Sequence, residues 1–372
     1  MNMRKPDYYD NFHCIADQCP LTCCQEWKIY VDDDTLARWK TLAIADAVTY
    51  REGERVIGLT PEHRCPFLND QKLCKLVLTY GDSVLSETCA VFPRQIHVRN
   101  GVTEYSLAAC CPAVVDEWNR KTAIRFLEEP GSNSTDRLLA LRGSMLALMQ
   151  NSSYTCSQSL SMIFYLLREV YDADTITNQA LADFTDASGL QKLADAIGRL
   201  PAVPVDSLAE CNELFLDLAE NYRKEGLYPS YLTPIAQKAE EIALDYEAPD
   251  LLDRLRRFQI SMADYELLFQ NYLAAEIFSS VLLPESDLET MLAAFQWIGM
   301  EYAVLRQALF LRWLLDEEVL SYETIRNYLC VIARMTGYDE ADYCEYLENS
   351  FEELIWDWGY FALICPHRSV FS

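Results

Sequence analysis

The run Cys14-Ile-Ala-Asp-Gln-Cys19-Pro-Leu-Thr-Cys23-Cys24 places four cysteines within a short stretch of chain. Nine of the 14 cysteines fall in the first 111 residues, and the other five of these are Cys65, Cys74, Cys89, Cys110 and Cys111. The adjacent Cys23 and Cys24 are poorly placed to bond to each other, whereas closely spaced thiolates can converge on a metal. We therefore expect the N-terminal third to fold around its cysteines.

Disulfides are the alternative use of so many cysteines. They suit small secreted domains, but this chain has 372 residues and its first residues lack the apolar stretch of a signal peptide. The most apolar later segment, residues 291–315, is interrupted by Glu301, Arg306 and Arg312, which indicates a buried helix and no membrane span. We expect a cytoplasmic protein with reduced thiols.

The net charge of −26 is unevenly distributed along the chain. Residues 1–128 hold 15 basic and 18 acidic side chains, a net charge of −3, so residues 129–372 carry −23. A surface this acidic repels phosphate backbones, which argues against nucleic acid as a partner. It would attract a basic, lysine-bearing protein, although a solvated face of amphipathic helices explains the same charge.

The N-terminal part predicts short elements. A strand is expected at residues 27–31, helices at 35–48 and 73–80, and a further helix from Pro112 to about Glu128. Residues 96–98 and 104–107 flank Asn100-Gly101, the strongest short signal for a β-hairpin, because both turn residues accept positive φ.

Beyond a Pro- and Gly-containing linker at 129–136, the apolar spacing is helical. Helices are expected over 138–150, 160–171, 181–200, 208–222, 233–246, 264–282, 288–316, 322–335 and 339–356. The predicted fold is mainly α: a cysteine-rich metal-binding domain with a small β-hairpin (residues 1–128), the linker (129–136), and an acidic α-helical bundle or array (137–372).

The cysteine spacing fits no common metal motif. No Cys-x-x-Cys pair occurs, although that pair is the usual half-site for zinc, and the gaps of four and three match neither radical-SAM nor ferredoxin runs. Thiolate ligands still favour an iron–sulfur cluster or zinc over hard cations. His13 and His63 lie next to cysteines, where local hydrogen bonding is the simpler expectation. Four cysteines in helical segments are expected to be small buried apolar residues: Cys156, Cys211, Cys330 and Cys344. Cys365 is the one late cysteine kept as a possible ligand.

Several ordered segments carry a resemblance to a known family. They are Phe12-His-Cys14, Cys19-Pro-Leu-Thr-Cys23-Cys24-Gln-Glu-Trp27, Asp32, Cys65-Pro-Phe-Leu68, Leu73-Cys74, Cys89-Ala-Val-Phe-Pro-Arg94, Ser106-Leu107 and Cys111-Pro112. In these the chain resembles the flagellin lysine-N-methylase family, whose N-terminal part is similar to the zinc- or iron-chelating cysteine-cluster domain. The resemblance covers about the first third of the chain.

This resemblance implies an S-adenosylmethionine-dependent protein lysine N-methyltransferase acting on flagellin or a similar lysine-bearing protein. It also implies a [4Fe–4S] cluster, with zinc as the alternative. The implied metal ligands are Cys14, Cys19, Cys23, Cys24, Cys65, Cys74, Cys89 and Cys111, and Cys110 has no counterpart among them.

The chain has only 12 glycines and no strand–Gly-x-Gly–helix unit, so it lacks a Rossmann-type methyltransferase domain. Either an iron without a protein ligand chelates the cofactor, or the cluster is purely structural. Arg94 is the candidate cofactor-binding residue, because a guanidinium can pair with the cofactor carboxylate; a structural ion pair is its alternative role.

Methyl transfer needs a neutral amine, so a base or desolvation is required. The sequence does not single out a catalytic base among the candidates Tyr30, Asp32, Asp33, Glu87 and Tyr105. Two other functions remain open at this stage: a non-catalytic zinc- or iron-binding interaction module, and a redox or radical enzyme.

Overall fold

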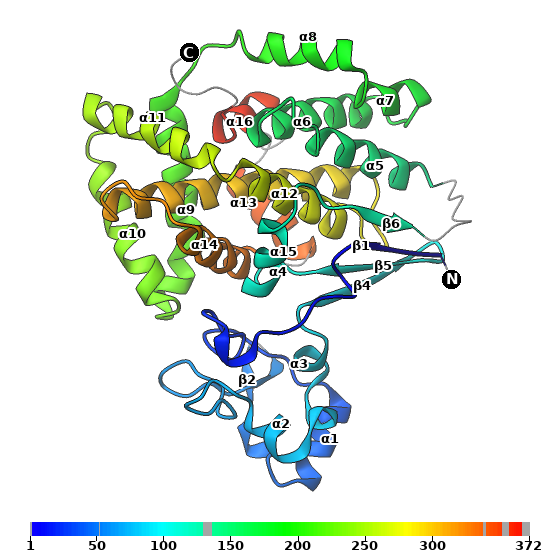
Figure 1. Cartoon of the computed structure of the whole chain (residues 1–372), viewed down its shortest axis with the longest axis vertical. Coiled ribbons are helices and arrows are strands. Elements are labelled where there is room, and N and C mark those ends of the chain that lie inside the picture. The colour runs from blue at the N-terminus through cyan, green and yellow to red at the C-terminus, as the bar shows by residue number, and fades with distance from the viewer. Residues whose placement is uncertain (1, 52, 129–135, 338–339, 352–356, 367–372) are drawn as a thin grey trace.

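The computed structural model describes residues 2–51, 53–128, 136–337, 340–351 and 357–366. Its described part is mainly α-helical, as the sequence predicts (Figure 1). The large helical body contains α5 (Arg137–Met149), α6 (Cys156–Asp172), α7 (Asn178–Asp183), α8 (Ala187–Ile197), α9 (Pro204–Lys224), α10 (Pro229–Ile242), α11 (Pro249–Ala263), α12 (Glu266–Ser280), α13 (Leu288–Leu315), α14 (Tyr322–Met335), α15 (Glu340–Phe351) and α16 (Trp358–Ile364).

Helix α13 is the centre of this body. It is apolar on all sides, as a helix surrounded by other helices must be, and α6, α9, α10 and α14 are among the helices that pack around it. Asp287 caps its first turn by accepting from the Thr290 amide at 3.0 Å. Gly299 permits close contact between α13 and α16, because a Cβ at this position would lie 2.4 Å from the Phe361 ring.

A four-stranded sheet of β1 (Asn2–Pro6), β4 (Arg94–Arg99), β5 (Val102–Leu107) and β6 (Phe126–Glu128) lies against this body. Its strand order is β4-β5-β1-β6, and β1 runs parallel to β5. The predicted hairpin is confirmed: β4 and β5 are antiparallel, and Asn100 and Gly101 turn with φ of 49° and 76°.

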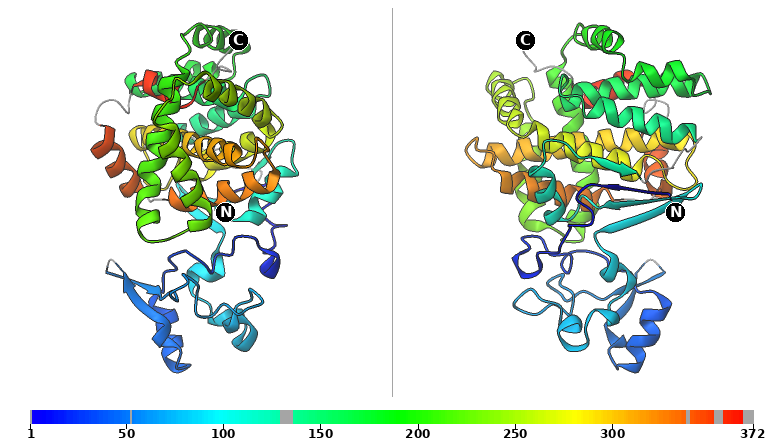
Figure 2. Two further views of the ribbon diagram at one scale, coloured as in Figure 1. Left: turned by 90° about the vertical axis from the view of Figure 1, so that its left-hand side faces the viewer. Right: turned by 45° about the vertical axis from the view of Figure 1, so that its right-hand side comes forward.

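The remaining N-terminal elements form a small lobe that projects from the helical body (Figure 2). It contains α1 (Asp33–Thr41), β2 (Val48–Arg51), β3 (Glu54–Ile57), α2 (Lys75–Tyr80) and α3 (Glu87–Val91), with short 3-10 turns at Ala16–Gln18, Ala45–Ala47 and Asp82–Val84. The lobe has its own small core around Val31, Trp39 and Cys65. In contrast, Phe12, Leu21 and Cys111 belong to the core of the helical body.

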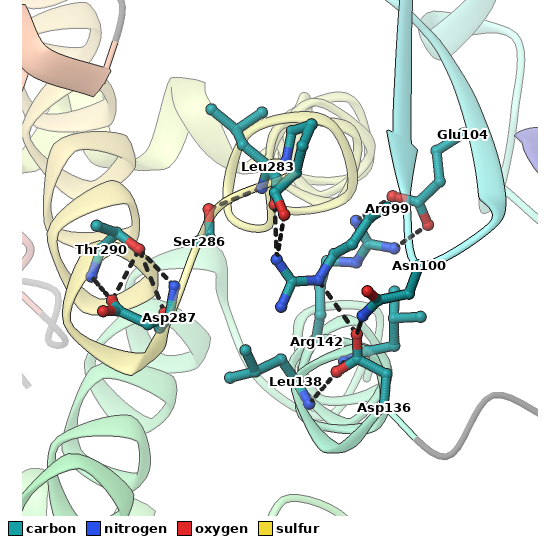
Figure 3. A network of polar contacts seen from close by, with 12 residues as sticks. Arg99, Asn100, Glu104, Asp136, Leu138, Arg142, Leu283, Ser286, Asp287 and Thr290 are labelled. Carbon is teal, nitrogen blue, oxygen red and sulfur yellow. Dashed lines mark hydrogen bonds and ion pairs between the residues drawn. The ribbon is translucent and has the colours of Figure 1, made fainter.

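Polar contacts hold the sheet to the helices at the hairpin turn (Figure 3). Arg99 donates to Asp136 at 3.1 Å and to the Leu283 carbonyl at 3.0 Å. Deeper in the interface, buried Arg142 of α5 donates to both carboxylate oxygens of Glu104 on β5 and to the Phe278 carbonyl of α12. The sheet and the helical body are thus joined through ion pairs as well as apolar packing.

Several predicted elements differ from the structure. Residues 27–31 form no strand. Tyr30 makes only an isolated antiparallel β-bridge with Val56. The helix that begins at Pro112 is α4 (Pro112–Asn119), after which the chain turns into β6, because the Asn271 side chain binds backbone groups of Trp118, Lys121 and Ile124. The helix predicted over 181–200 is divided at Asp186, which caps α8.

Helices α3, α11 and α16 and strands β1, β2, β3 and β6 were not predicted. Most of the predicted linker, residues 129–135, lies outside the described residues, as do the first and last residues of the helix predicted over 339–356. No helix in the described part of the chain has the length and apolar character needed to cross a bilayer.

Candidate functional site

The structure gathers the N-terminal cysteines in two neighbourhoods. All 14 thiols are free. In the small lobe, Cys24 accepts hydrogen bonds from the thiols of Cys23 and Cys65, which lower its pKa to about 3. Burial raises the pKa of Cys89 to about 11, and the nearby Cys24 and Cys74 act in the same direction. We call Cys23, Cys24, Cys65, Cys74 and Cys89 the lobe cysteines.

The second neighbourhood lies where the cysteine run meets the helical body. Burial raises the pKa of Cys111 to about 12, and the nearby Cys14 and Cys19 add to the rise. Cys330 of α14 lies beside Cys19, Cys110 and Cys111, and its thiol contacts the Ala109 carbonyl at 3.6 Å. Cys330 is buried in the core, as the sequence predicts. Its place next to this group could not be read from spacing along the chain.

As their side chains stand, no three His, Cys, Asp or Glu residues in the described ranges are arranged to hold a single metal ion. The thiol contacts are instead pairwise and centred on Cys24. The chemistry of this donor set still suits zinc or an iron–sulfur cluster, because soft thiolates prefer these groups to hard cations. A cluster has several metal atoms, so its ligands need not meet at one point.

Arg334 of α14 ties the cysteine run to the helical body. It is 5% exposed and donates to the backbone carbonyls of Leu21 at 2.8 Å and Cys110 at 3.3 Å. Its guanidinium also lies 5.3 Å from the Trp27 ring centroid. Arg334 therefore fixes Trp27 and both cysteine segments against α14, and sequence reasoning did not single it out.

A cavity of about 310 Å³ lies at this junction. Its N-terminal wall contains Trp27, Arg94 and Cys110, and its helical wall contains Glu276, Trp297, Glu301, Arg334 and Tyr343. The volume is at the lower end of the range for small-molecule sites, roughly 300–1,000 Å³. Among the predicted site residues, Arg94 alone lines the cavity; the implied metal ligands and the candidate bases are not in its lining.

Arg94 lies in the cavity wall without an acidic partner. Its guanidinium stacks over the rings of Phe12 at 5.5 Å and Tyr9 at 5.9 Å, and none of the described carboxylates forms an ion pair with it. The guanidinium is therefore available to an anionic group of a ligand. Arg94 is the predicted residue that the structure places best for binding.

The two carboxylates of the opposite wall were missed by the sequence analysis. Glu301 of α13 is 8% exposed and accepts hydrogen bonds from the hydroxyls of Tyr272 and Thr336. Burial and the charge of Glu301 raise the pKa of Glu276 on α12 to about 8. A signal for Glu301 was present, since it is a carboxylate inside a nearly continuous apolar helix.

The candidate bases near the cysteines have structural roles or lie on the surface. Asp32 caps α1 by accepting from the Thr35 amide at 2.8 Å, and Asp33 pairs with Arg55 at 2.6 Å. Tyr105 packs on Tyr9, while Tyr30 and Glu87 are exposed.

The two histidines and the reserve cysteine also have local roles. His13 forms a hydrogen bond with the Asn11 carbonyl at 2.7 Å, which is the local hydrogen bonding expected of it. His63 lies in a turn with φ of 55°. Cys365 is buried in the helical body, with its thiol 3.4 Å from the Gly299 carbonyl.

Comparison with known proteins gives one family. The model of the FliB lysine N-methylase C-terminal domain matches residues 142–364. The flagellar biosynthetic protein FliU of Salmonella muenchen is 29% identical over 128 residues, which cover 31% of this chain and 75% of that protein. No solved structure matches the chain.

The lysine-N-methylases of Salmonella choleraesuis and Salmonella typhimurium are 29% and 28% identical over 128 residues, 31% of each protein. The matched stretch thus spans about a third of the length of these two curated relatives. The family model, however, covers more than half of this chain, from α5 to α16. The chain therefore belongs to the FliB lysine N-methylase family.

Proposed function

We propose that this protein is a protein lysine N-methyltransferase that uses S-adenosylmethionine and acts on flagellin or a similar lysine-bearing protein. The observation that carries the proposal is the cavity between the cysteine segments and the helical body, in a chain of this family. One wall of the cavity contains Arg94, which has no acidic partner among the described carboxylates, and the other wall contains Glu276 and Glu301. This arrangement suits two ligands, one with an anionic group and one with a cationic group.

In this proposal Arg94 binds the cofactor carboxylate, and the aromatic wall around Trp27 and Trp297 excludes water. Trp27 packs edge-on against Phe92 at 4.7 Å, and Trp297 stacks on Tyr343 at 6.0 Å. Aromatic faces also favour cations, including a sulfonium. When bound, the cofactor supplies an electrophilic methyl group; the protein aligns the amine with that methyl.

We further propose that four of the eight implied ligands, with Cys24 among them, hold a [4Fe–4S] cluster, since such a cluster takes four cysteine thiolates. The eight are the lobe cysteines together with Cys14, Cys19 and Cys111. The clustering of thiols around Cys24 and Cys111 supports this choice, and zinc is the alternative that the same donors would accept.

The test begins with anaerobic purification and assay of iron, acid-labile sulfide and zinc in one sample. About four irons and four sulfides per chain are expected for a cubane cluster. Cys24→Ser should abolish most of the metal content, whereas Cys344→Ser, a cysteine of similar exposure in α15, should leave it unchanged. Equal metal content in both variants would contradict the ligand assignment.

The enzymatic part is tested by incubating the loaded protein with labelled S-adenosylmethionine and purified flagellin. Methylated lysine is expected in the flagellin. If the protein neither binds the cofactor nor methylates flagellin, the alternative of a non-catalytic metal-binding interaction module gains support.

A further inference from the structure

The cavity at the junction has a polarised charge distribution. Arg94 contributes a cation from the strand side, while Glu276 and Glu301 contribute carboxylates from α12 and α13. The Glu276 carboxylate accepts a hydrogen bond from the Ser280 hydroxyl at 3.3 Å. Within the described residues, no lysine or arginine forms an ion pair with either glutamate.

Two carboxylates in one enclosed space are unfavourable unless a cation or a proton accompanies them. Removing charges from water costs free energy, and a like charge nearby adds to that cost. A protein that keeps such a pair in a cavity therefore has a strong preference for a cationic group there. The same cavity has apolar side walls, Trp27 and Trp297, that fit an alkyl chain.

We propose that Glu276 and Glu301 are the receptor for the ε-amino group of the substrate lysine, and that Glu276 accepts its proton. The proposal rests on the function proposed above. Glu301 already accepts two hydroxyl hydrogen bonds, from Tyr272 and Thr336, so it serves as the fixed anion that orients the ammonium. Glu276 has one hydroxyl partner and is partly exposed to the cavity, so it is the carboxylate with room for a proton.

Glu276 takes one proton from the lysine ammonium, and the nitrogen lone pair thus freed forms the new N–C bond to the methyl group. The C–S bond of the sulfonium donor breaks, and its electron pair remains on sulfur as a neutral thioether. The proton on Glu276 then passes to solvent through the cavity mouth.

One other cation could occupy the pair, namely the α-ammonium of the methyl donor itself. The two cases make opposite predictions for binding. If the pair receives lysine, neutralising a glutamate weakens binding of flagellin and leaves donor affinity unchanged. If it receives the donor, the reverse holds.

The experiment compares Glu276→Gln and Glu301→Gln with Glu285→Gln in the full, cluster-loaded chain. Glu285 is exposed just beyond α12 and gives the same charge change outside the cavity. Binding of purified flagellin is measured calorimetrically without methyl donor, with lysine-acetylated flagellin as the negative control. Donor affinity, melting temperature and the pH profile of methylation are measured on the same samples.

We expect Glu276→Gln to weaken flagellin binding at least ~10-fold and to slow methylation by roughly 10²–10⁴-fold, the usual contribution of a positioned base. Its melting temperature should be unchanged or higher, because a destabilising charge is removed, and Glu276→Asp should recover part of the rate. A purely structural role would instead lower the melting temperature and leave the pH profile intact.

The inference is overturned if Glu276→Gln keeps wild-type flagellin affinity and rate, or if it loses donor affinity instead. Both outcomes require an active wild-type protein. An inactive wild type that binds no donor would reject the proposed function itself, so the two failures are distinguishable.

Discussion

At the scale of single residues, Arg94 is the most informative side chain of the N-terminal part. The residue lines the cavity and its guanidinium stacks on Phe12 and Tyr9, yet no described carboxylate pairs with it. A structural arginine would be expected to have such a partner, because an unpaired cation in a partly enclosed site is costly. Arg94 therefore has the properties expected of a residue that binds an anionic ligand.

Replacing Arg94 by Met should weaken binding of S-adenosylmethionine about 10- to 100-fold, since a charge-assisted hydrogen bond contributes ~1.5–3 kcal/mol. Stability should change by about 1 kcal/mol or less, the value of the lost cation–π contacts. Isothermal titration calorimetry and thermal melting measure the two effects. Arg125→Met, at a side chain 80% exposed, is the control. An unchanged donor affinity in Arg94→Met would remove Arg94 from the binding site.

At the scale of secondary-structure elements, the contact between β5 and α5 depends on one buried ion pair. Arg142 and Glu104 have side-chain exposures of 2% and 7%, and Arg142 also stacks on Phe278 at 4.9 Å. Removing Arg142 leaves Glu104 only its longer contact with Arg4, at 3.9 Å, so a charge inside the protein is then poorly compensated. This costs far more than losing a surface pair.

Arg142→Met should therefore lower the free energy of unfolding by about 3–5 kcal/mol. Arg120→Met, which removes a surface pair with Glu117, should cost at most ~1 kcal/mol. Urea denaturation of the three proteins measures the difference. The double variant Glu104→Leu with Arg142→Met should recover part of the loss, because no charge is then left unpaired. A loss in Arg142→Met no larger than that in Arg120→Met would show that the pair does not hold the sheet.

The elements that could be predicted are those determined by residues close to one another in the sequence. The hairpin followed from Asn100-Gly101, and α14 was predicted from its apolar spacing at residues 322–335, its observed bounds. Strand β1 could not be predicted, because it pairs with β5 about a hundred residues away and has no strand-like composition of its own. The end of α4 depends on Asn271, another distant residue.

The site was predictable in part for the same reason. Arg94 stood in a recognisable motif, so its sequence context pointed to it. Glu276, Glu301 and Arg334 come from three helices of the other half of the chain, and only folding brings them to one cavity. The isolated charge of Glu301 in an apolar helix was a usable signal that a buried polar function exists, without indicating its partner.

At the scale of the whole molecule, the carboxylate pair should make stability depend on pH. The pKa of Glu276 is raised from 4.5 to about 8 by burial and by Glu301. An acid whose pKa is raised by folding stabilises the fold when protonated, and this contribution is lost as pH rises from about 4.5 to about 8. Other titratable or charged groups lie near Glu276 and Glu301 and influence the pH range over which Glu276 titrates. They are Tyr8, Tyr272, Arg94, Cys110, Arg334 and Tyr343.

Glu276→Gln should therefore be more stable than the wild type at pH 8.5 and about equal at pH 5. A gain of about 1–3 kcal/mol is expected, less than the full shift would give, because Glu276 is partly exposed to the cavity. Melting curves of both proteins across this pH range measure it, with Glu285→Gln as the control. A constant difference at every pH would show that Glu276 does not titrate in this window.

The acidity of the whole helical half leads to a prediction about its partner. Residues 129–372 carry a net charge of −23, and the cavity opens where this half meets the nearly balanced N-terminal part. A field of this sign speeds encounter with a lysine-bearing surface, and salt screens it over about 8–10 Å. Raising the ionic strength from 50 to 500 mM should slow association with flagellin about 10-fold or more, while dissociation changes little. Stopped-flow or surface-plasmon measurements give both rates, and donor affinity over the same range is the control. Association that is independent of salt would mean that the acidic face is ordinary solvated helix surface, and that recognition lies in the cavity alone.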